Sequence, residues 1–270
     1  MLTASYAKIN LFLEVTGKLP NGYHKVNTVL SSIDLCDYIS YDLSPRGDIS
    51  FSCNYEELAT PDNLICKIAM HLKDRYRVSA GISIYLDKRI PIAAGLGGGS
   101  SNAANCIESL NQLWQLGLST SEMHAIAAEF GSDINFFLQG GCALGENRGE
   151  QISPLPFIDI PMILLINPNI PIASSTAYKL IGSVNYISKS FDPARLSSSC
   201  FNRLERGIRK AYPIIDKLLV DLSTFGTEVA MMSGSGSTCF GIFKDEARLN
   251  DCKAYFDALG MITIRTKTIS

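Results

Sequence analysis

Residues 91–104 read P-I-A-A-G-L-G-G-G-S-S-N-A-A, a glycine-rich run that lies between a predicted strand and a predicted helix. Apolar residues alternate with other residues over 82–86, which is the period of a strand, and Pro91 marks its limit. Within 103–114 apolar side chains recur at intervals of four, three and four, the stripe of a helix that starts near Ser100. The run therefore leads from the end of a strand into the start of a helix.

The glycine-rich run suits the binding of phosphate. Glycine has no Cβ atom, so its backbone takes φ values that other residues resist and can direct several N–H groups at phosphate oxygens. A helix start adds unsatisfied N–H groups and the positive end of the helix dipole. Neither the Walker pattern nor the Gly-x-Gly-x-x-Gly dinucleotide pattern fits the run. A tight strand-to-helix turn is the alternative explanation, but the density of glycines favours phosphate binding.

Bulk composition limits the class of protein. The chain has 270 residues, of which 46% are hydrophobic and 19% are charged, as in globular proteins with a sizeable core. This length suggests two domains that share a cleft, with one larger domain as the alternative. Lys and Arg number 24 against 26 Asp and Glu, and no basic run is present, so a nucleic-acid partner is not expected.

The cysteines and the apolar segments bear on location. The eight cysteines form no C-x-x-C pair and no zinc-like spacing, so we expect small buried apolar residues. No stretch of about 18 apolar residues and no basic leader occurs, so no membrane segment is expected. A reducing cytoplasm is the simplest predicted location.

Periodicity predicts several further elements. Ser119 and Glu122 form a possible capping box for a helix that Gly131 would end. Residues 183–199 are rich in serine and weakly periodic, which indicates a surface loop. The other predicted elements are strands at 9–15 and 49–53, a helix at 64–77, a strand at 162–166 that opens a second domain, helices within 202–224 and an apolar segment at 229–232.

Three motifs together resemble the GHMP kinases, a family named for galacto-, homoserine, mevalonate and phosphomevalonate kinases. The run at 91–104 is similar to their phosphate-binding signature, and A-K-I-N-L-F-L at 7–13 is similar to their first motif. M-S-G-S-G-S-T-C-F-G-I-F at 232–243 is similar to their third motif. The resemblance implies an ATP-dependent kinase with an α+β fold, an N-terminal nucleotide-cradle domain at 1–157 and a C-terminal ferredoxin-like α/β sandwich domain at 158–270.

The resemblance also implies the catalytic residues. Phosphoryl transfer to a hydroxyl needs a proton acceptor and a cation that offsets developing charge. The family has these groups at the positions of Asp133 and Lys8. Taken alone, an Asp after Gly-Ser is more often a helix cap, and a Lys in a strand is more often solvated. Only the matched motifs favour the catalytic roles.

ATP is the implied co-substrate, and Mg²⁺ is expected to accompany it. Gly234 and Gly236 would let the backbone of the third motif approach the cleft, and its serines Ser233, Ser235 and Ser237 would donate to phosphate or water. A tight hairpin is the alternative. Metal ligands are not evident, although Ser100, Ser101 or water alone would serve. The ATP-binding residues implied by the resemblance are Asn63, near the adenine, and Pro91, Ile92, Ala93, Ala94, Gly95, Leu96, Gly97, Gly98, Gly99, Ser100 and Ser101.

Short segments narrow the acceptor. G-Y-H at 22–24, D-N-L at 62–64 and G-S-D-I-N-F-F-L at 131–138 look like those GHMP kinases that phosphorylate a diphosphocytidyl methylerythritol. The implied substrate is thus a cytidine-diphosphate-linked sugar alcohol. The matching residues are Tyr23 and His24 for the cytidine, Asn10 for the sugar alcohol, and Thr176 and Tyr178 in a substrate-contacting segment.

Two other functions stay open at this point. A GHMP kinase for homoserine or a mevalonate-type alcohol would share the glycine motifs, and a non-catalytic nucleotide-binding relative would keep the cradle. The chain also departs from the family pattern at Asn21, at Ile134 and Asn135, and at Asn147. The loss of a proline at position 135 predicts a looser loop after the catalytic Asp. The sequence does not predict the oligomeric state.

Overall fold

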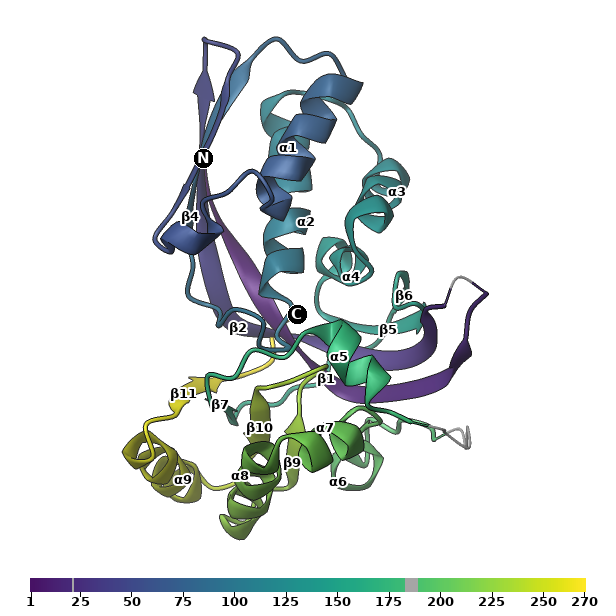
Figure 1. Cartoon of the computed structure of the whole chain (residues 1–270), viewed down its shortest axis with the longest axis vertical. Coiled ribbons are helices and arrows are strands. Elements are labelled where there is room, and N and C mark those ends of the chain that lie inside the picture. The colour runs from purple at the N-terminus through teal and green to yellow at the C-terminus, as the bar shows by residue number, and fades with distance from the viewer. Residues whose placement is uncertain (21, 183–188) are drawn as a thin grey trace. The chain divides into compact units, whose positions relative to one another are not determined.

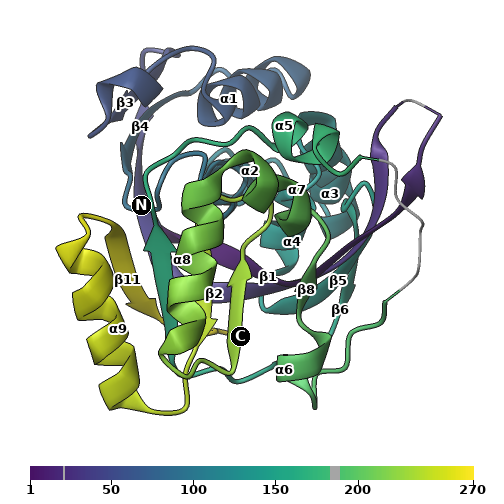
Figure 2. The ribbon, with the colours of Figure 1, turned by 60° about the horizontal axis from the view of Figure 1, so that its bottom comes forward.

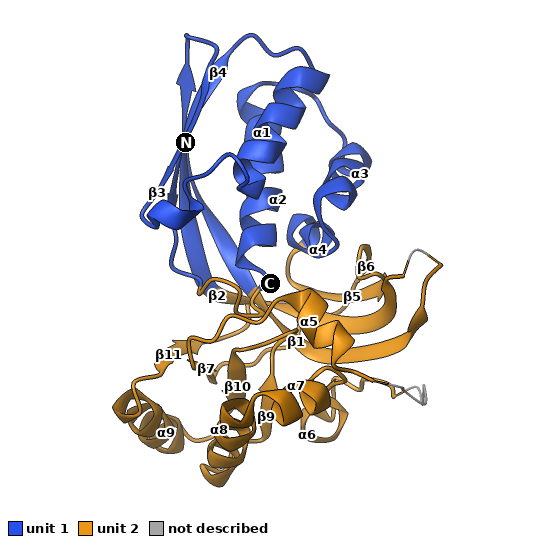
Figure 3. Cartoon of the chain, viewed as in Figure 1, with its two compact units in different colours: residues 1–7, 35–90, 97–139 blue, residues 8–34, 91–96, 140–270 orange. Residues whose placement is uncertain are grey.

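The computed structural model describes residues 1–20, 22–182 and 189–270, and these form two compact units (Figure 3). Both units are discontinuous, because strands β1 (Leu2–Lys18) and β2 (His24–Ser44) contribute residues to both. The units therefore do not follow the predicted continuous domains, and the boundary between 157 and 158 stays a prediction. Unit 1 contains residues 1–7, 35–90 and 97–139, and unit 2 contains residues 8–34, 91–96 and 140–270.

Unit 1 is a sheet with helices packed against it (Figure 1). Its strands follow the order β3-β4-β2-β1, with β3 parallel and β2 antiparallel to β4. Buried side chains of β2 and β4 form one core with those of α1, α2 and α3. The bounds are β3 (Ile49–Cys53), the 3₁₀ helix η1 (Glu56–Leu58), α1 (Leu64–Arg75), β4 (Gly81–Asp87), α2 (Gly98–Leu113), α3 (Thr120–Phe130) and α4 (Ile134–Gln139).

Local signals account for much of unit 1. The predicted capping box is confirmed, since the Ser119 hydroxyl accepts from the Glu122 N–H and the Glu122 side chain accepts from the Ser119 N–H. Gly131 caps the other end of α3, as expected. The predicted helix at 64–77 ends at Arg75, because Arg77 has φ +52°, which lies outside the helical region.

Unit 2 combines the rest of β1 and β2 with a second sheet. β8 pairs with β1 in parallel, and β5 joins β2 to β6 by antiparallel pairing. The second sheet is antiparallel with the order β11-β7-β10-β9. The bounds are β5 (Cys142–Asn147), β6 (Gln151–Pro154), β7 (Ile163–Asn167), α5 (Ser174–Lys179), α6 (Leu196–Ser199), β8 (Phe201–Asn202), α7 (Glu205–Ala211), α8 (Pro213–Thr224), β9 (Val229–Met232), β10 (Cys239–Ile242), α9 (Glu246–Ala258) and β11 (Ile262–Thr266).

Helices α8 and α9 pack against the second sheet (Figure 2). Leu164 and Ile166 of β7 share one core with Leu218 of α8 and Phe256 of α9. An antiparallel sheet backed by helices is the predicted α/β sandwich, and the prediction of an α+β fold is confirmed. The predicted strand at 162–166 and the helices within 202–224 are also present, with bounds shifted by one to three residues.

The burial of β1 differs from its sequence pattern. The predicted strand at 9–15 is present, but every residue from Ala7 to Val15 is buried. The alternation of apolar and other residues therefore does not separate a buried face of the strand from a solvent-exposed one. Its polar residues Lys8, Asn10 and Glu14 therefore lie inside the protein, where each needs partners.

Two other predictions are tested in part. Residues 183–188 of the predicted loop lie outside the described residues, and residues 196–199 form the short helix α6. All eight cysteines are free, and the five that are buried are Cys66, Cys106, Cys142, Cys239 and Cys252. Within the described ranges, the helices are too short or too polar to cross a membrane.

Candidate active site

Lys8 of β1 is buried in unit 2 and only 3% exposed. Its ammonium donates to Asn10 Oδ1 at 2.5 Å and to Gly95 O at 2.9 Å. Its backbone N–H donates to Leu96 O at 3.0 Å. These bonds fix the lysine beside the first half of the glycine-rich run.

Asn10 orients this lysine. Its Nδ2 donates to the Thr28 hydroxyl at 2.8 Å, and that hydroxyl donates to Phe12 O at 2.7 Å. Because Thr28 uses the amide nitrogen, the amide oxygen of Asn10 is left to face the ammonium. The β1 and β2 backbones thereby set the position of the Lys8 charge.

The third glycine motif contacts the same place. It forms a hairpin in which residues 233–238 join β9 to β10. The Ser233 hydroxyl donates to Gly95 O at 3.0 Å and accepts from the Asn10 N–H at 3.4 Å. The Thr238 N–H donates to Ala94 O at 3.2 Å. The hairpin alternative is therefore correct, and the hairpin also lies against the lysine and the glycine-rich run.

Close backbone approach explains two of these glycines. A Cβ on Gly95, which has φ +76°, would lie 2.2 Å from Ser233 O. A Cβ on Gly234, which has φ +54°, would lie 3.1 Å from each of Lys8 Nζ, Asn10 Oδ1 and Gly95 O. The contacts between the run and the hairpin thus leave no room for a side chain at Gly95 and would crowd one at Gly234.

The hydroxyls of the third motif are used differently from the prediction. Ser233 and Ser237 are buried, and they donate to the backbone oxygens of Gly95 and Ile170, the second at 2.5 Å. The expected role as phosphate donors is therefore wrong for these two serines, because their protons already bind protein acceptors. Ser235 is less buried and lies 3.2 Å from the Ser174 hydroxyl.

The glycine-rich run is divided between the units. Residues 91–96 belong to unit 2, where Ile92 and Ala93 are exposed and Ala94 and Leu96 are buried. In unit 1, Gly97 has φ +71° and precedes α2, which begins at Gly98 rather than near Ser100. The first N–H groups of a helix have no acceptor within the helix, so this start keeps backbone donors for a ligand.

Two serines follow the glycines in α2. The Ser101 hydroxyl is buried 2.7 Å from the Ser5 hydroxyl. Ser100 is half-buried, and Gly99 is exposed with no atom within 4 Å of the place where its Cβ would be. Of these three residues, Ser100 and Gly99 are the ones that a ligand can reach.

Asp133 and Asn63 lie in unit 1. Asp133 is half-buried and immediately precedes α4. Asn63 caps α1, since its Oδ1 accepts from the Ile65 N–H at 3.0 Å and its Nδ2 donates to Leu58 O at 3.0 Å. Its amide is thus used in the fold, and its contact with adenine stays a prediction.

Two of the residues predicted to contact the substrate, His24 and Tyr178, come together in unit 2. The rings of His24 and Tyr178 are stacked, with centroids 5.0 Å apart and planes inclined by 19°. Tyr23 is 59% exposed, and the Arg148 guanidinium lies 5.6 Å from its ring centroid. Thr176 lies in α5 with Tyr178.

The surroundings of the His24 imidazole favour its neutral form. Partial burial lowers its pKa below the ordinary value of 6.5, and the nearby charge of Lys18 lowers it further. A neutral imidazole has one donor and one acceptor nitrogen, which suits the edge of a base.

A metal site is not formed by acidic side chains alone. The described part of the chain has no group of three His, Cys, Asp or Glu side chains close enough to hold an ion. Mg²⁺ commonly keeps its waters and binds one or two protein oxygens together with substrate phosphates.

Comparison with known proteins identifies the family. The model for the GHMP kinase N-terminal domain matches residues 63–141, and the model for the GHMP kinase C-terminal domain matches residues 190–260. The 4-diphosphocytidyl-2-C-methyl-D-erythritol kinase of Shouchella clausii is 38% identical over 258 residues, covering 90% of this chain and 86% of that relative. The chain belongs to the GHMP kinases. It is an ATP-dependent kinase that acts on an alcohol.

Other similar proteins agree with this assignment. A protein of the same name from Caldanaerobacter subterraneus is 37% identical to this GHMP kinase over 269 residues, covering 95% of the chain and 92% of the relative. The crystal structure of a 4-(cytidine 5'-diphospho)-2C-methyl-D-erythritol kinase matches with a TM-score of 0.88 and 25% identity, over 100% of both chains. The Methanococcus jannaschii mevalonate kinase matches over 100% of this chain and 98% of its own with a TM-score of 0.75, but its 12% identity shows the fold alone.

The structure accounts for two departures of this GHMP kinase from the family pattern. Asn147 has φ +62°, a left-handed conformation that asparagine tolerates better than most residues other than glycine. Ile134 and Asn135 are buried in α4, so the looser loop predicted for this segment is wrong. Asn135 occupies the first turn of a helix, where the chain does not need the fixed φ of proline. Asn21 lies outside the described residues.

Sequence reasoning missed Thr28 and Arg148 in unit 2 and Asp37 in unit 1. Thr28 and Arg148 gave no local signal, because a threonine in a strand and an arginine in a turn are common. Asp37 is buried with no exposed surface, which is unusual for a carboxylate. Nothing in the sequence around it indicates its partners, which come from distant segments.

Proposed function

We propose that this GHMP kinase transfers the γ-phosphate of ATP to the 2-hydroxyl of 4-diphosphocytidyl-2-C-methyl-D-erythritol, a step in non-mevalonate isoprenoid synthesis. One observation carries the choice of acceptor: relatives named as that kinase are 36–38% identical over about nine-tenths of the chain. Homoserine and mevalonate kinases match at 12–16% identity, which supports the shared fold and not a shared acceptor.

The chemistry uses Asp133 and Lys8. The acceptor oxygen forms a bond to the γ-phosphorus, the bond from that phosphorus to the β,γ-bridging oxygen breaks, and ADP leaves. The hydroxyl proton passes to the Asp133 carboxylate, which acts as general base. Lys8 offsets the charge that develops on the transferring group. Its fixed contacts with Asn10 and Gly95 support this role, since a positioned charge loses little energy to reorganisation.

ATP binds through backbone donors of the run at 91–101. The exposed Gly99 and the left-handed Gly97 support this proposal, because both leave the start of α2 open to phosphate oxygens. Asn63 lies near the adenine in this proposal, although its amide caps α1 and its backbone N–H and C=O bond to Thr60 O and the Lys67 N–H. A Mg²⁺ ion bound with ATP would neutralise part of the phosphate charge, and the half-buried hydroxyl of Ser100 at the start of α2 would be the side chain to hold it.

The cytidine binds against His24, Tyr178 and Tyr23. Stacked and exposed rings offer a surface for a pyrimidine, and the neutral His24 can pair with its edge. Asn10 and Thr176 contact the sugar alcohol. We also propose a cytoplasmic location, which suits the eight free cysteines.

A product assay tests the proposal. Purified protein is incubated with ATP, Mg²⁺ and one acceptor at a time, and products are identified by mass spectrometry. The expected result is ADP with phosphorylated 4-diphosphocytidyl-2-C-methyl-D-erythritol, and little product from homoserine or mevalonate. Phosphorylation of either of those alcohols in preference to the cytidyl acceptor would assign a different acceptor. ATP binding without any product would indicate a non-catalytic relative.

A further inference from the structure

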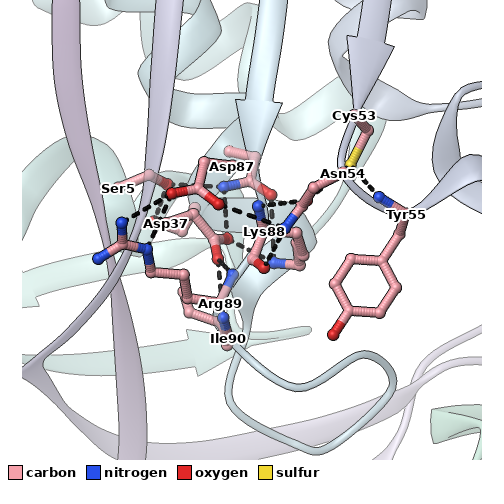
Figure 4. A network of polar contacts seen from close by, with 11 residues as sticks. Ser5, Asp37, Cys53, Asn54, Tyr55, Asp87, Lys88, Arg89 and Ile90 are labelled. Atoms are coloured by element: carbon pink, nitrogen blue, oxygen red, sulfur yellow. Dashed lines mark hydrogen bonds and ion pairs between the residues drawn. The ribbon is translucent and has the colours of Figure 1, made fainter.

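Asp37 of β2 is buried in unit 1 against Lys88, the residue that follows β4 (Figure 4). One carboxylate oxygen, Oδ2, accepts from the Lys88 ammonium. The other, Oδ1, accepts from the backbone N–H groups of Arg89 at 2.7 Å and Ile90 at 2.8 Å. The carboxylate thus holds the two residues that lead into the glycine-rich run at Pro91.

The same carboxylate reaches the far end of the run. Its Oδ2 accepts from Asn102 Nδ2 at 2.8 Å, and that amide also donates to the Ser5 hydroxyl at 2.9 Å. The Ser5 hydroxyl lies 2.7 Å from that of Ser101. Asn102 and Ser101 belong to the first turns of α2, which follow the glycines directly.

Lys88 lies beneath the start of α2. A Cβ on Gly98 would lie 2.6 Å from Lys88 Nζ, so the absence of a side chain at Gly98 leaves the space that the ammonium occupies. The ammonium also donates to Asn102 Oδ1 at 3.3 Å. A positive charge is unfavourable at a helix N-terminus, and the Asp37 carboxylate compensates for it there.

Stability alone is a weak reason for such a pair. Taking two charges out of water costs free energy that their attraction seldom exceeds, and apolar residues of similar size often stabilise a fold as well. Burial lowers the pKa of Lys88, an effect that the Asp37 charge opposes. A buried pair with this cost is best explained by the geometry that it fixes.

We infer that Asp37 and Lys88 are positioning residues that hold the two ends of the phosphate-binding run in the arrangement that the nucleotide requires. The inference rests on the proposed function only in that the run binds ATP. Asp37 anchors residues 89 and 90 before the glycines and Asn102 after them, and Lys88 supports Gly98 from below. Neither residue touches the reacting atoms, so both act through the backbone of the run.

Asp37→Asn is the first test, because the groups around the carboxylate all donate. Lys88 Nζ, Asn102 Nδ2 and the two backbone N–H groups need acceptors, whereas an amide would present its own N–H groups on one side. The run should therefore shift. We expect KM for ATP to rise about tenfold or more, while kcat at saturating ATP and KM for the acceptor change less than about twofold.

The double variant Asp37→Asn with Lys88→Met provides a rescue. With the ammonium removed, the new amide at position 37 can accept through its oxygen from residues 89 and 90, and its nitrogen can donate to Asn102 Oδ1 once the Asn102 amide turns over. Thermal stability should recover toward that of wild type, and KM for ATP should return to within about threefold of the wild-type value, because a neutral network replaces the charged one. This variant also covers the case in which Asp37→Asn alone does not fold.

Glu14→Gln is the matched control. Glu14 is 2% exposed in unit 2 and accepts from Arg203 Nε at 2.6 Å and Nη2 at 2.7 Å, so its substitution also breaks a buried ion pair. We expect it to lower the melting temperature and leave KM for ATP within about twofold of wild type.

The outcomes separate clearly when ATP binding is also measured by calorimetry. A rise in KM and Kd for ATP in Asp37→Asn, with rescue in the double variant, supports the inference. Unchanged ATP binding in a folded Asp37→Asn protein overturns the inference and leaves the proposed function intact. A double variant that is stable but whose KM for ATP stays raised has the same two consequences. Wild-type protein that binds no ATP would overturn the proposed function, and this inference with it.

Discussion

The contact between Gly95 and Ser233 gives the sharpest test of the site geometry. The change is Gly95→Ala, which adds one methyl group where the glycine-rich run meets the hairpin of the third motif. That methyl carbon would lie 2.2 Å from Ser233 O and 2.9 Å from Gly236 N, against an ordinary contact of at least 3.4 Å. Both neighbours are backbone atoms, so a side-chain rotation cannot relieve the overlap.

The cost has two parts. Gly95 has φ +76°, and alanine in the left-handed region costs about 1–2 kcal/mol. Moving the hairpin away also weakens the bonds that Gly95 O accepts from the Ser233 hydroxyl at 3.0 Å and the Lys8 ammonium at 2.9 Å. These contribute about 1 and about 2 kcal/mol, so the free energy of unfolding should fall by about 4–5 kcal/mol.

Gly117→Ala is the control that isolates the cost of placing alanine in a left-handed backbone conformation. Gly117 has φ +67°, and no atom lies within 4 Å of the place where its Cβ would be. Its substitution should cost only the conformational term of about 1–2 kcal/mol and leave kcat/KM unchanged. Urea unfolding and the product assay are to be run on both variants, and Gly95→Ala should also lose about 100-fold in kcat/KM because Lys8 is displaced.

The comparison between the two variants tests whether Ser233 O lies close to Gly95 and whether that contact positions Lys8. If Gly95→Ala lost no more stability than Gly117→Ala, the close approach of Ser233 O would not exist in solution. If it lost stability but kept kcat/KM, the position of Lys8 would not depend on Gly95, and the geometric basis of the Lys8 role would fail.

Three further predictions concern the chemistry and the two ligands. Asp133→Ala should lower kcat by about 10²–10⁴-fold while calorimetry shows ATP affinity within a few-fold of wild type, and near-normal turnover would exclude Asp133 as the base. The KM of wild type for the cytidyl acceptor should be constant above pH 6.5 and rise below it, because the lowered pKa of His24 delays protonation to that range. His24→Gln should give a flat pH profile, and a profile that still bends would assign the effect to another group. Gly99→Ala should raise the free energy of unfolding by about 0.5–1 kcal/mol and raise KM for ATP, whereas unchanged KM would remove Gly99 from the nucleotide contact.

Elements with local signals were predictable from the sequence. The capping box at Ser119 and Glu122 encodes the start of α3 within four residues, and β4 alternates buried and exposed side chains as its pattern indicates. The end of α1 was placed two residues too late, because the left-handed φ of Arg77 is set by its surroundings and not by a glycine or proline.

The packing of the candidate site was less predictable. Lys8, Asn10 and Glu14 read as the polar side of an alternating strand, yet all three are buried because β1 is covered on both faces. The Glu14 carboxylate forms an ion pair with Arg203, a residue 189 positions away. Such partners depend on tertiary structure, and the sequence gives no period or motif that connects them.

Some glycines of the run are explained by packing within the protein, and one is not. A Cβ on Gly95 would overlap the backbone oxygen of Ser233, and a Cβ on Gly98 would enter the space of the Lys88 ammonium, so packing within the fold bears on both. Gly99 has ordinary backbone angles, open space around it and a place in a helix, where alanine would be more stable by about 0.5–1 kcal/mol. The protein therefore carries a local cost at Gly99 that no contact within the described chain repays. The phosphate contact proposed for the start of α2 would account for that cost, because a phosphate group there would need the surface that a methyl group covers.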